Sequence, residues 1–102
     1  MPRLFVLSGP DVGAALAFEG SATVGREKSA DLVVRSPSVS RLHARLEERA
    51  GRWFVVDLGS SNGTHVGGAR VRESELQDGQ LFSLGDVEVR FRLPSAEPTT
   101  PV

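Results

Sequence analysis

Apolar and polar residues alternate in short runs along this chain, with the period of two that places every second side chain on the same face of a β-strand. Residues 87–93 are the clearest example, because valine, phenylalanine and leucine alternate there with glutamate and arginine. Such a strand has one buried and one solvated face, as antiparallel sheets commonly do. Further short apolar runs that we interpret as strands are residues 4–7, 15–18, 22–25, 32–34, 43–47, 53–58 and 81–84.

Turn-forming residues separate these runs. Glycine, proline, asparagine and aspartate gather between them, as at Asn62-Gly63 and Asp78-Gly79, and the chain holds 11 Gly and 6 Pro. No segment of useful length has the 3.6-residue period of an amphipathic helix. Short strands joined by frequent turns predict an all-β fold, a sandwich of two antiparallel sheets rather than a βαβ arrangement.

The length of 102 residues fits a single domain with one core. We expect this domain to occupy residues 1–93. Residues 94–102 are rich in proline and have no hydrophobic period, which predicts a disordered tail or the start of a linker within a larger multidomain protein. The apolar run at residues 4–7 is too short for a secretory signal or a membrane span. We therefore expect a cytoplasmic protein that does not contact the membrane.

Charge and composition narrow the classes of function. The formal net charge is -1, so the chain lacks the basic excess of a nucleic-acid-binding protein. With no cysteine and 2 His, we expect neither a metal nor another cofactor. Lys28 is the single lysine among 12 basic residues, and this arginine excess indicates a GC-rich bacterial source.

Three polar clusters stand at the ends of predicted strands, at residues 25–26, 40–43 and 57–64. The strands at 43–47 and 53–58 are joined by a tight turn around Gly51, so they should pair antiparallel. That pairing places the second cluster beside the third. The stretch 35–42 is long enough to bring the first cluster to the same end, so geometry allows the convergence of all three without requiring it.

If the clusters converge, their side chains suit a doubly charged oxyanion. A phosphothreonine carries about −1.5 to −2 charges at pH 7 and three strong acceptor oxygens. Arg26 and Arg41 would supply guanidinium donors, and Ser40 and Ser61 would supply hydroxyl donors. The amide of Asn62 both donates and accepts, which suits the backbone of an extended peptide.

At these residues the sequence resembles the forkhead-associated (FHA) domain family. The family pattern is a Gly-Arg pair, then Ser-Arg-x-His, then Ser-x-Asn-Gly-Thr after an apolar strand, and here the three elements stand in order at 25–26, 40–43 and 60–64. The resemblance extends over residues 4–93. It implies an eleven-stranded sandwich of the FHA/SMAD-like type that binds phosphothreonine-containing segments of partner proteins, such as substrates of Ser/Thr kinases, through loops at one end.

The resemblance also implies a role for each matching residue. Arg26, Ser40 and Ser61 would contact the phosphate, Arg41 would be a further basic contact, and Asn62 would hold the peptide backbone. The residues that would shape the loops without touching the ligand are Gly25, His43 and Gly63.

Other readings of the same residues remain open at this level. Arg41 could pair with Glu47 or Asp57, or face water. The fold could also serve as a phosphorylation-independent interaction or assembly module that uses a sheet face. His43, Asp57 and a serine at 60 or 61 supply the residue types of a nucleophilic triad, but a domain of this size has little room for a substrate cleft as well as a core. We therefore expect no enzymatic activity.

Overall fold

The computed structural model describes residues 1–94, which form eleven β-strands. In chain order the strands are β1 (Arg3–Val6), β2 (Ala15–Ala17), β3 (Ser21–Gly25), β4 (Leu32–Val33), β5 (Ala44–Arg49), β6 (Arg52–Asp57), β7 (Thr64–Val66), β8 (Ala69–Val71), β9 (Glu73–Leu76), β10 (Leu81–Leu84) and β11 (Val87–Arg92). The tail expected at residues 94–102 lies, apart from Pro94, outside the described residues.

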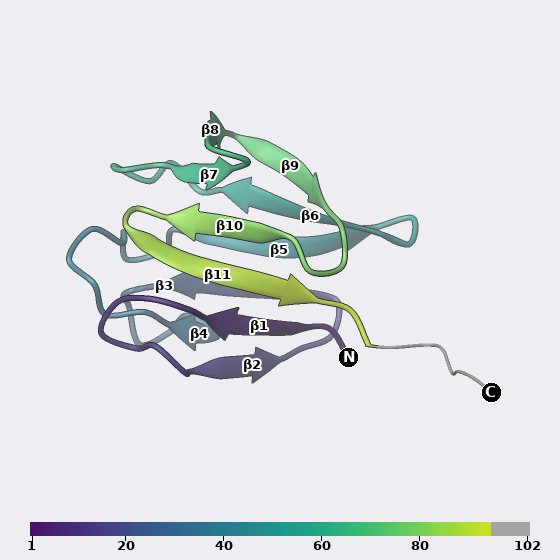
Figure 1. Ribbon diagram of the computed structural model, residues 1–102, viewed down its shortest axis with the longest axis horizontal. Helices are drawn as coiled ribbons and strands as arrows, with labels where there is room; N and C mark the ends of the chain where they lie inside the picture. Colours follow the sequence, from purple (N-terminus) through teal and green to yellow (C-terminus); the bar gives the residue numbers. More distant parts are fainter. Residues whose placement is uncertain (95–102) are drawn as a thin grey trace.

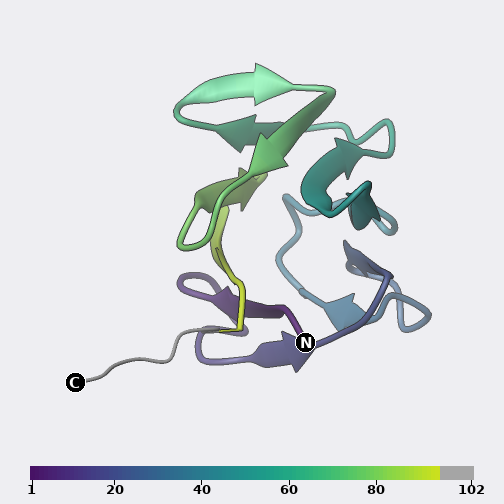
Figure 2. The ribbon, with the colours of Figure 1, turned by 90° about the vertical axis from the view of Figure 1, so that its right-hand side faces the viewer.

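The strands form two sheets that pack face to face. One has six strands in the order β2-β1-β11-β10-β7-β8, and the other has five in the order β4-β3-β5-β6-β9. Figure 2, seen from the end that carries the chain termini, shows β10 and β11 in one layer and β5 and β6 in the other. The predicted all-β sandwich is confirmed. The pairing between β3 and β4 is parallel, and it is the one exception to the antiparallel pattern among the pairs of residues 1–94.

A continuous apolar core fills the space between the sheets. The predicted alternation at the end of the chain is confirmed, because Val87, Val89 and Phe91 are fully buried on one face of β11. Trp53 of β6 packs across the sandwich, with ring centroids 5.4 Å from Phe18 and 5.9 Å from Phe91. Burial of such side chains contributes about 1.5–3 kcal/mol each, so this core is the main source of stability.

The hairpin β5–β6 is the element that brings the predicted clusters together. Its strands pair antiparallel from Ala44 opposite Asp57 to Arg49 opposite Arg52, as the sequence predicts. The turn is formed by Ala50 and Gly51, which both have positive φ angles, of 51° and 79°. Two consecutive positive φ values match the primed turns whose twist suits a two-residue hairpin. The start of β5 therefore lies beside the end of β6, at the end of the molecule opposite this turn (Figure 1).

Three strands, β7, β8 and β9, are absent from the runs that we interpreted as strands. They are short, and only Leu76 among the eight residues of β8, β9 and the intervening Arg72 is buried, so the hydrophobic period that marks a strand is weak there. The Gly67-Gly68 turn between β7 and β8 was the available signal. The described residues contain no helix long and apolar enough to cross a membrane.

Candidate functional site

Three loops meet at the end of the sandwich where β5 begins and β6 ends. They follow β3, β4 and β6, and each carries one of the polar clusters singled out in the sequence. The backbone N–H of Arg26 donates to the carbonyl oxygen of Ser40 at 3.0 Å. The hydroxyl oxygen of Ser40 in turn accepts the backbone N–H of Ser61 at 3.1 Å. Ser40 therefore links the other two loops, and the convergence that the sequence allowed is present.

Gly25 permits the close approach of the first two loops. A Cβ atom at this position would lie 2.0 Å from the carbonyl oxygen of Arg41, far inside van der Waals contact. The same carbonyl accepts the backbone N–H of Glu27 at 3.1 Å, so the loops are held at this spacing. Only glycine fits here, and the reason is steric contact with backbone rather than a left-handed conformation.

His43 lies buried beneath the loops and holds two of them by hydrogen bonds. Its side chain is fully buried, and its Nδ1 accepts the backbone N–H of Ser40 at 3.0 Å. Nε2 therefore carries the ring proton and donates it to the carbonyl oxygen of Gly63 at 2.9 Å. Burial lowers the pKa of His43, which favours this neutral form. One ring thus positions the second loop through Ser40 and the third through Gly63.

Asp57, at the end of β6, organises the turn that follows. Its Oδ1 accepts the hydroxyls of Ser60 at 2.5 Å and Thr64 at 2.8 Å, and its Oδ2 accepts the backbone N–H groups of Gly59 and Ser60 at 3.0 Å each. Burial alone would raise the pKa of Asp57, but the hydrogen bonds from the Ser60 and Thr64 hydroxyls and from the backbone N–H groups of Ser60 and Gly59 together outweigh it, and the pKa is lowered. The Ser60 hydroxyl donates to the carboxylate and not to His43, so this cluster lacks the serine–histidine contact of a triad.

The predicted ligand-contacting side chains lie around the rim of these loops. Arg26, Arg41, Ser61 and Asn62 are exposed, and Ser40 is half-buried. Internal contacts use only part of their capacity. Arg26 donates Nε–H to the carbonyl oxygen of Val39 at 2.9 Å, which leaves the two terminal nitrogens of its guanidinium for a ligand. Ser40 uses its hydroxyl oxygen as an acceptor, and its O–H remains a donor.

Asn62 is held in the same partial way. Its Nδ2 donates to the carbonyl oxygen of Ser38 at 2.8 Å, and Oδ1 remains as an acceptor. Gly63 follows with φ +88°, a conformation that glycine adopts without strain. A specific feature accounts for the loop-shaping role expected of each of three residues: close contact with backbone at Gly25, two hydrogen bonds at His43 and a positive φ at Gly63.

Arg41 is not engaged in either of the ion pairs that we considered for it. Glu47 pairs with Arg45 at 3.3 Å and with Arg49 at 2.5 Å, and Asp57 bonds to its own turn. Among residues 1–94, Arg41 forms no ion pair. Its guanidinium adds positive charge to the same rim.

Two supporting residues were not found from the sequence. The first is Asp86, whose Oδ1 accepts the hydroxyls of Ser36 at 3.0 Å and Ser38 at 2.5 Å. The Asp86 backbone N–H donates to the Ser38 hydroxyl oxygen at 3.0 Å, so the β10–β11 turn anchors the loop that carries Ser40. Hydrogen bonds from the Ser38 and Ser36 hydroxyls lower the pKa of Asp86. Nearly fifty residues separate the partners, and no local pattern marks such a contact.

The second is Arg70 of β8. Its side chain lies across Gly63, where an added Cβ would be 2.6 Å from Arg70 Nε, and its Nη2 approaches the carbonyl oxygen of Ser60 at 3.4 Å. Arg70 is exposed and adds an arginine beside the third loop, which follows β6. Recognising Gly67-Gly68 as a hairpin turn would have placed residue 70 here, because His65 pairs with Arg70 in that hairpin.

Comparison with known proteins agrees with this architecture. The FHA domain family model matches residues 22–85. The oxoglutarate dehydrogenase inhibitor of Corynebacterium glutamicum is 34% identical over 95 residues, covering 92% of this chain and 66% of the relative. The chain spans less than two thirds of the length of the curated relatives it matches.

Solved structures give the same result. An FHA domain studied for phosphothreonine-dependent interactions superposes with a TM-score of 0.81 at 32% identity, covering 91% of this chain and 96% of the other. Mycobacterium tuberculosis EmbR, solved in complex with a low-affinity phosphopeptide, superposes with a TM-score of 0.81 at 28% identity over 96% of this chain and 26% of EmbR. On the family match and these structures together, the chain belongs to the FHA domain family.

Proposed function

We propose that this chain is a signalling module that binds phosphothreonine-containing segments of partner proteins at the three-loop end of the sandwich. As an FHA domain it is a non-catalytic interaction module. The observation that carries the proposal is the hydrogen bond from the Ser61 N–H to the Ser40 hydroxyl oxygen, because it joins two loops next to Arg26 and leaves donors of all three on one rim.

Each side chain has a distinct task in this proposal. The terminal nitrogens of Arg26 and the hydroxyls of Ser40 and Ser61 donate to the phosphate oxygens. Arg41 adds a charge contact at the same rim. Asn62, fixed by its bond to the Ser38 carbonyl, presents its free amide atoms to the backbone of the extended peptide.

The wider setting belongs to the same proposal. A threonine acquires its phosphate from a Ser/Thr kinase, so the partner would be a kinase substrate, and the encounter would take place in the cytoplasm. Three arginines around the loops add favourable attraction for a dianion and leave discrimination to the hydroxyl and amide contacts.

The test is a titration by calorimetry with one threonine peptide in phosphorylated, unphosphorylated and phosphoserine forms. We expect binding of the phosphothreonine form, weaker binding of the phosphoserine form, and loss on removal of the phosphate. Arg26→Ala should weaken binding by about 10- to 150-fold, the equivalent of about 1.5–3 kcal/mol for charge-assisted bonds.

Arg52→Ala is the matched control, because Arg52 is an exposed arginine at the start of β6, at the opposite end of the β5–β6 hairpin from these loops, and its ion pair with Glu75 is a surface contact. Equal affinity for the phosphorylated and unphosphorylated peptides, unchanged by Arg26→Ala, would refute the proposal. It would favour the phosphorylation-independent module instead.

A further inference from the structure

The arginines on the two outer faces of the sandwich differ in how they are paired with carboxylates. On the five-stranded sheet, arginines and glutamates neutralise one another: Arg49 pairs with Glu47 and Glu73, at 2.5 Å and 2.9 Å, and Arg52 pairs with Glu75 at 2.6 Å. The first of these pairs lies within β5, the second reaches from β5 over β6 to β9, and the third joins the neighbouring strands β6 and β9. The positive charges of Arg49 and Arg52 on this face are therefore neutralised by glutamates of the same sheet.

The outer face of the six-stranded sheet is not balanced in this way. Arg3 of β1 stands directly opposite Arg92 of β11, and Phe5 stands opposite Arg90. Like charges directly opposite each other destabilise an antiparallel pair, so this register costs stability unless an anion lies between them. Among residues 1–94, the one ion pair that either arginine forms is that of Arg92 Nε with Asp78, at 3.2 Å. Asp78 also accepts the backbone N–H of Leu93 at 2.8 Å, which ties it to the Arg92 side.

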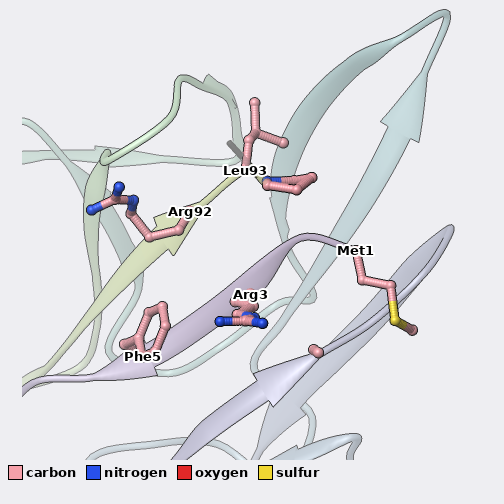
Figure 3. A pocket seen from close by; sticks show the side chains of 7 residues that line it. Met1, Arg3, Phe5, Arg92 and Leu93 are labelled. Atoms are coloured by element: carbon pink, nitrogen blue, oxygen red, sulfur yellow. The ribbon is translucent and has the colours of Figure 1, made fainter. Parts of the chain in front are cut away.

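A pocket opens on this face beside the two arginines. It has a volume of about 520 Å³ and is lined by Arg3 and Arg92 together with apolar side chains that include Met1, Phe5, Ala17 and Leu93. Figure 3 shows Arg3, Phe5 and Arg92 projecting from the neighbouring strands β1 and β11. Among the residues that line the pocket in the described part of the chain, none is acidic. The pocket therefore combines two positively charged side chains with an apolar lining.

The pocket lies at the opposite end of the sheet from the three loops. Strand β11 begins at Val87, next to the turn that anchors Ser38, and ends at Arg92. Five residue steps of a strand span roughly 17 Å. Figure 1 shows β11 running from the end that carries the loops to the end that carries the chain termini. This separation leaves room for a ligand on the pocket and a phosphopeptide on the loops at the same time.

We propose that this pocket is a docking site for an acidic segment of a partner protein, in which carboxylates contact Arg3 and Arg92 and an apolar side chain enters the space beside Phe5. Charge complementarity selects this occupant. Among residues 1–94, Arg3 forms no ion pair and Arg92 pairs with Asp78 alone, whereas the arginines Arg49 and Arg52 of the opposite outer face are neutralised by three glutamates. Charges of this kind determine specificity and association rate more than raw affinity. The site does not depend on phosphate and goes beyond the function proposed for the loops.

The experiment is an amide chemical-shift titration of the full, isotope-labelled chain with the unphosphorylated peptide acetyl-EELEEF-amide. We expect shifts at Arg3, Phe5, Ala17 and Arg92 and none at Ser40 or Ser61. The peptide acetyl-QQLQQF-amide should bind about tenfold or more weakly, because it cannot form charge-assisted bonds. Arg3→Glu/Arg92→Glu should abolish the shifts.

Matched variants keep the outcome interpretable. Arg45→Glu/Arg52→Glu changes the net charge equally on the other outer face and should leave binding intact. Arg3→Gln/Arg92→Gln removes the charges with little change in size and should weaken binding even if the glutamate pair disturbs folding. The proposal is overturned by equal binding of both peptides, by an equal loss in the Arg45/Arg52 variant, or by shifts confined to the loops. Ultracentrifugation that showed a dimer abolished by Arg3→Glu would assign the pocket to a second copy and would overturn it as well.

Discussion

His43 Nε2 lies 2.9 Å from the carbonyl oxygen of Gly63, inside the part of the sandwich that supports the binding loops. This distance matters because the opposite ring nitrogen is already occupied by the backbone N–H of Ser40. The ring can form both hydrogen bonds, to Ser40 and to Gly63, in its neutral form only, since a protonated Nδ1 could no longer accept a hydrogen bond. Loop geometry is therefore coupled to the protonation state of one buried histidine.

The first prediction concerns stability against pH. Burial lowers the pKa of His43 in the folded protein below its ordinary value of 6.5, so the unfolded chain binds the proton more readily. The contribution of His43 is fully present above pH 6.5 and is lost as pH falls below that value towards the folded-state pKa. Within this window the free energy of unfolding should fall with a slope approaching about 1.4 kcal/mol per pH unit.

Urea unfolding at pH 7.5, 6.5 and 5.5 measures this slope. His43→Gln should flatten it, because glutamine can accept from Ser40 and donate to Gly63 without titrating. His65→Gln removes the other histidine and should keep the slope. Because the pKa of Asp57 is lowered from 3.8, its own contribution to stability is present above that pH and is lost only below it, outside the range measured. An unchanged slope in His43→Gln would disprove the coupling.

The second prediction separates close packing from backbone strain at glycine. Gly25→Ala places a Cβ 2.0 Å from the Arg41 carbonyl oxygen, so the two loops must move apart. Overpacking of this kind costs about 1–3 kcal/mol, and it should also lower phosphopeptide affinity because Arg26 follows directly. Gly13→Ala is the control, since Gly13 has φ +94° but no atom within 4 Å of an added Cβ. It should cost stability and leave affinity unchanged; equal affinities in the two variants would count against the steric explanation.

The parts that the sequence predicted share a physical origin. Residues 87–93 show a full apolar–charged alternation because β11 is central in its sheet and packs one face against the core. The rim residues Arg26, Ser40 and Asn62 could be found because each sits in a short motif at the end of a recognisable strand. Hairpin β5–β6 then places two of the three motifs together by register alone.

The parts that it missed arise from contacts with no local signature. Strands β8 and β9 carry mostly exposed or half-buried side chains, so packing leaves little periodicity in them. Asp86 supports the loop of Ser38 across 48 residues, and Arg70 reaches Gly63 only after β7 and β8 have paired. Such contacts depend on the assembled sheet, which composition and spacing do not reveal.

The third prediction tests Asp86 as the anchor of the Ser40 loop. Asp86→Ala removes the acceptor shared by the Ser36 and Ser38 hydroxyls, and Ser36 is buried, so its hydroxyl loses a partner that water cannot easily replace. Hydrogen exchange at the amides of Val39 and Ser40 should accelerate, and phosphopeptide affinity should fall several-fold. Asp78→Ala, which removes an exposed aspartate at the other end of β11, should change neither. Unaltered exchange in Asp86→Ala would show that the loop is held by its other contacts.

The last prediction is the pH dependence of phosphopeptide binding. A phosphothreonine loses its second charge as pH falls through about 6, so affinity should decrease between pH 7.5 and 5.5 as the arginines and hydroxyls of the rim face a monoanion. Protonation of His43 would act in the same direction, because it releases Ser40. The two causes separate in His43→Gln, in which only the ligand titrates and the midpoint should lie at the pKa of the peptide measured free in solution by ³¹P spectroscopy. Added salt should weaken binding at every pH, since the contacts are charged. If the affinity stayed constant over this pH range in both the wild type and His43→Gln, the rim residues would not distinguish the doubly charged phosphate from the singly charged one. The assignment of Arg26, Ser40 and Ser61 to the phosphate would then be wrong.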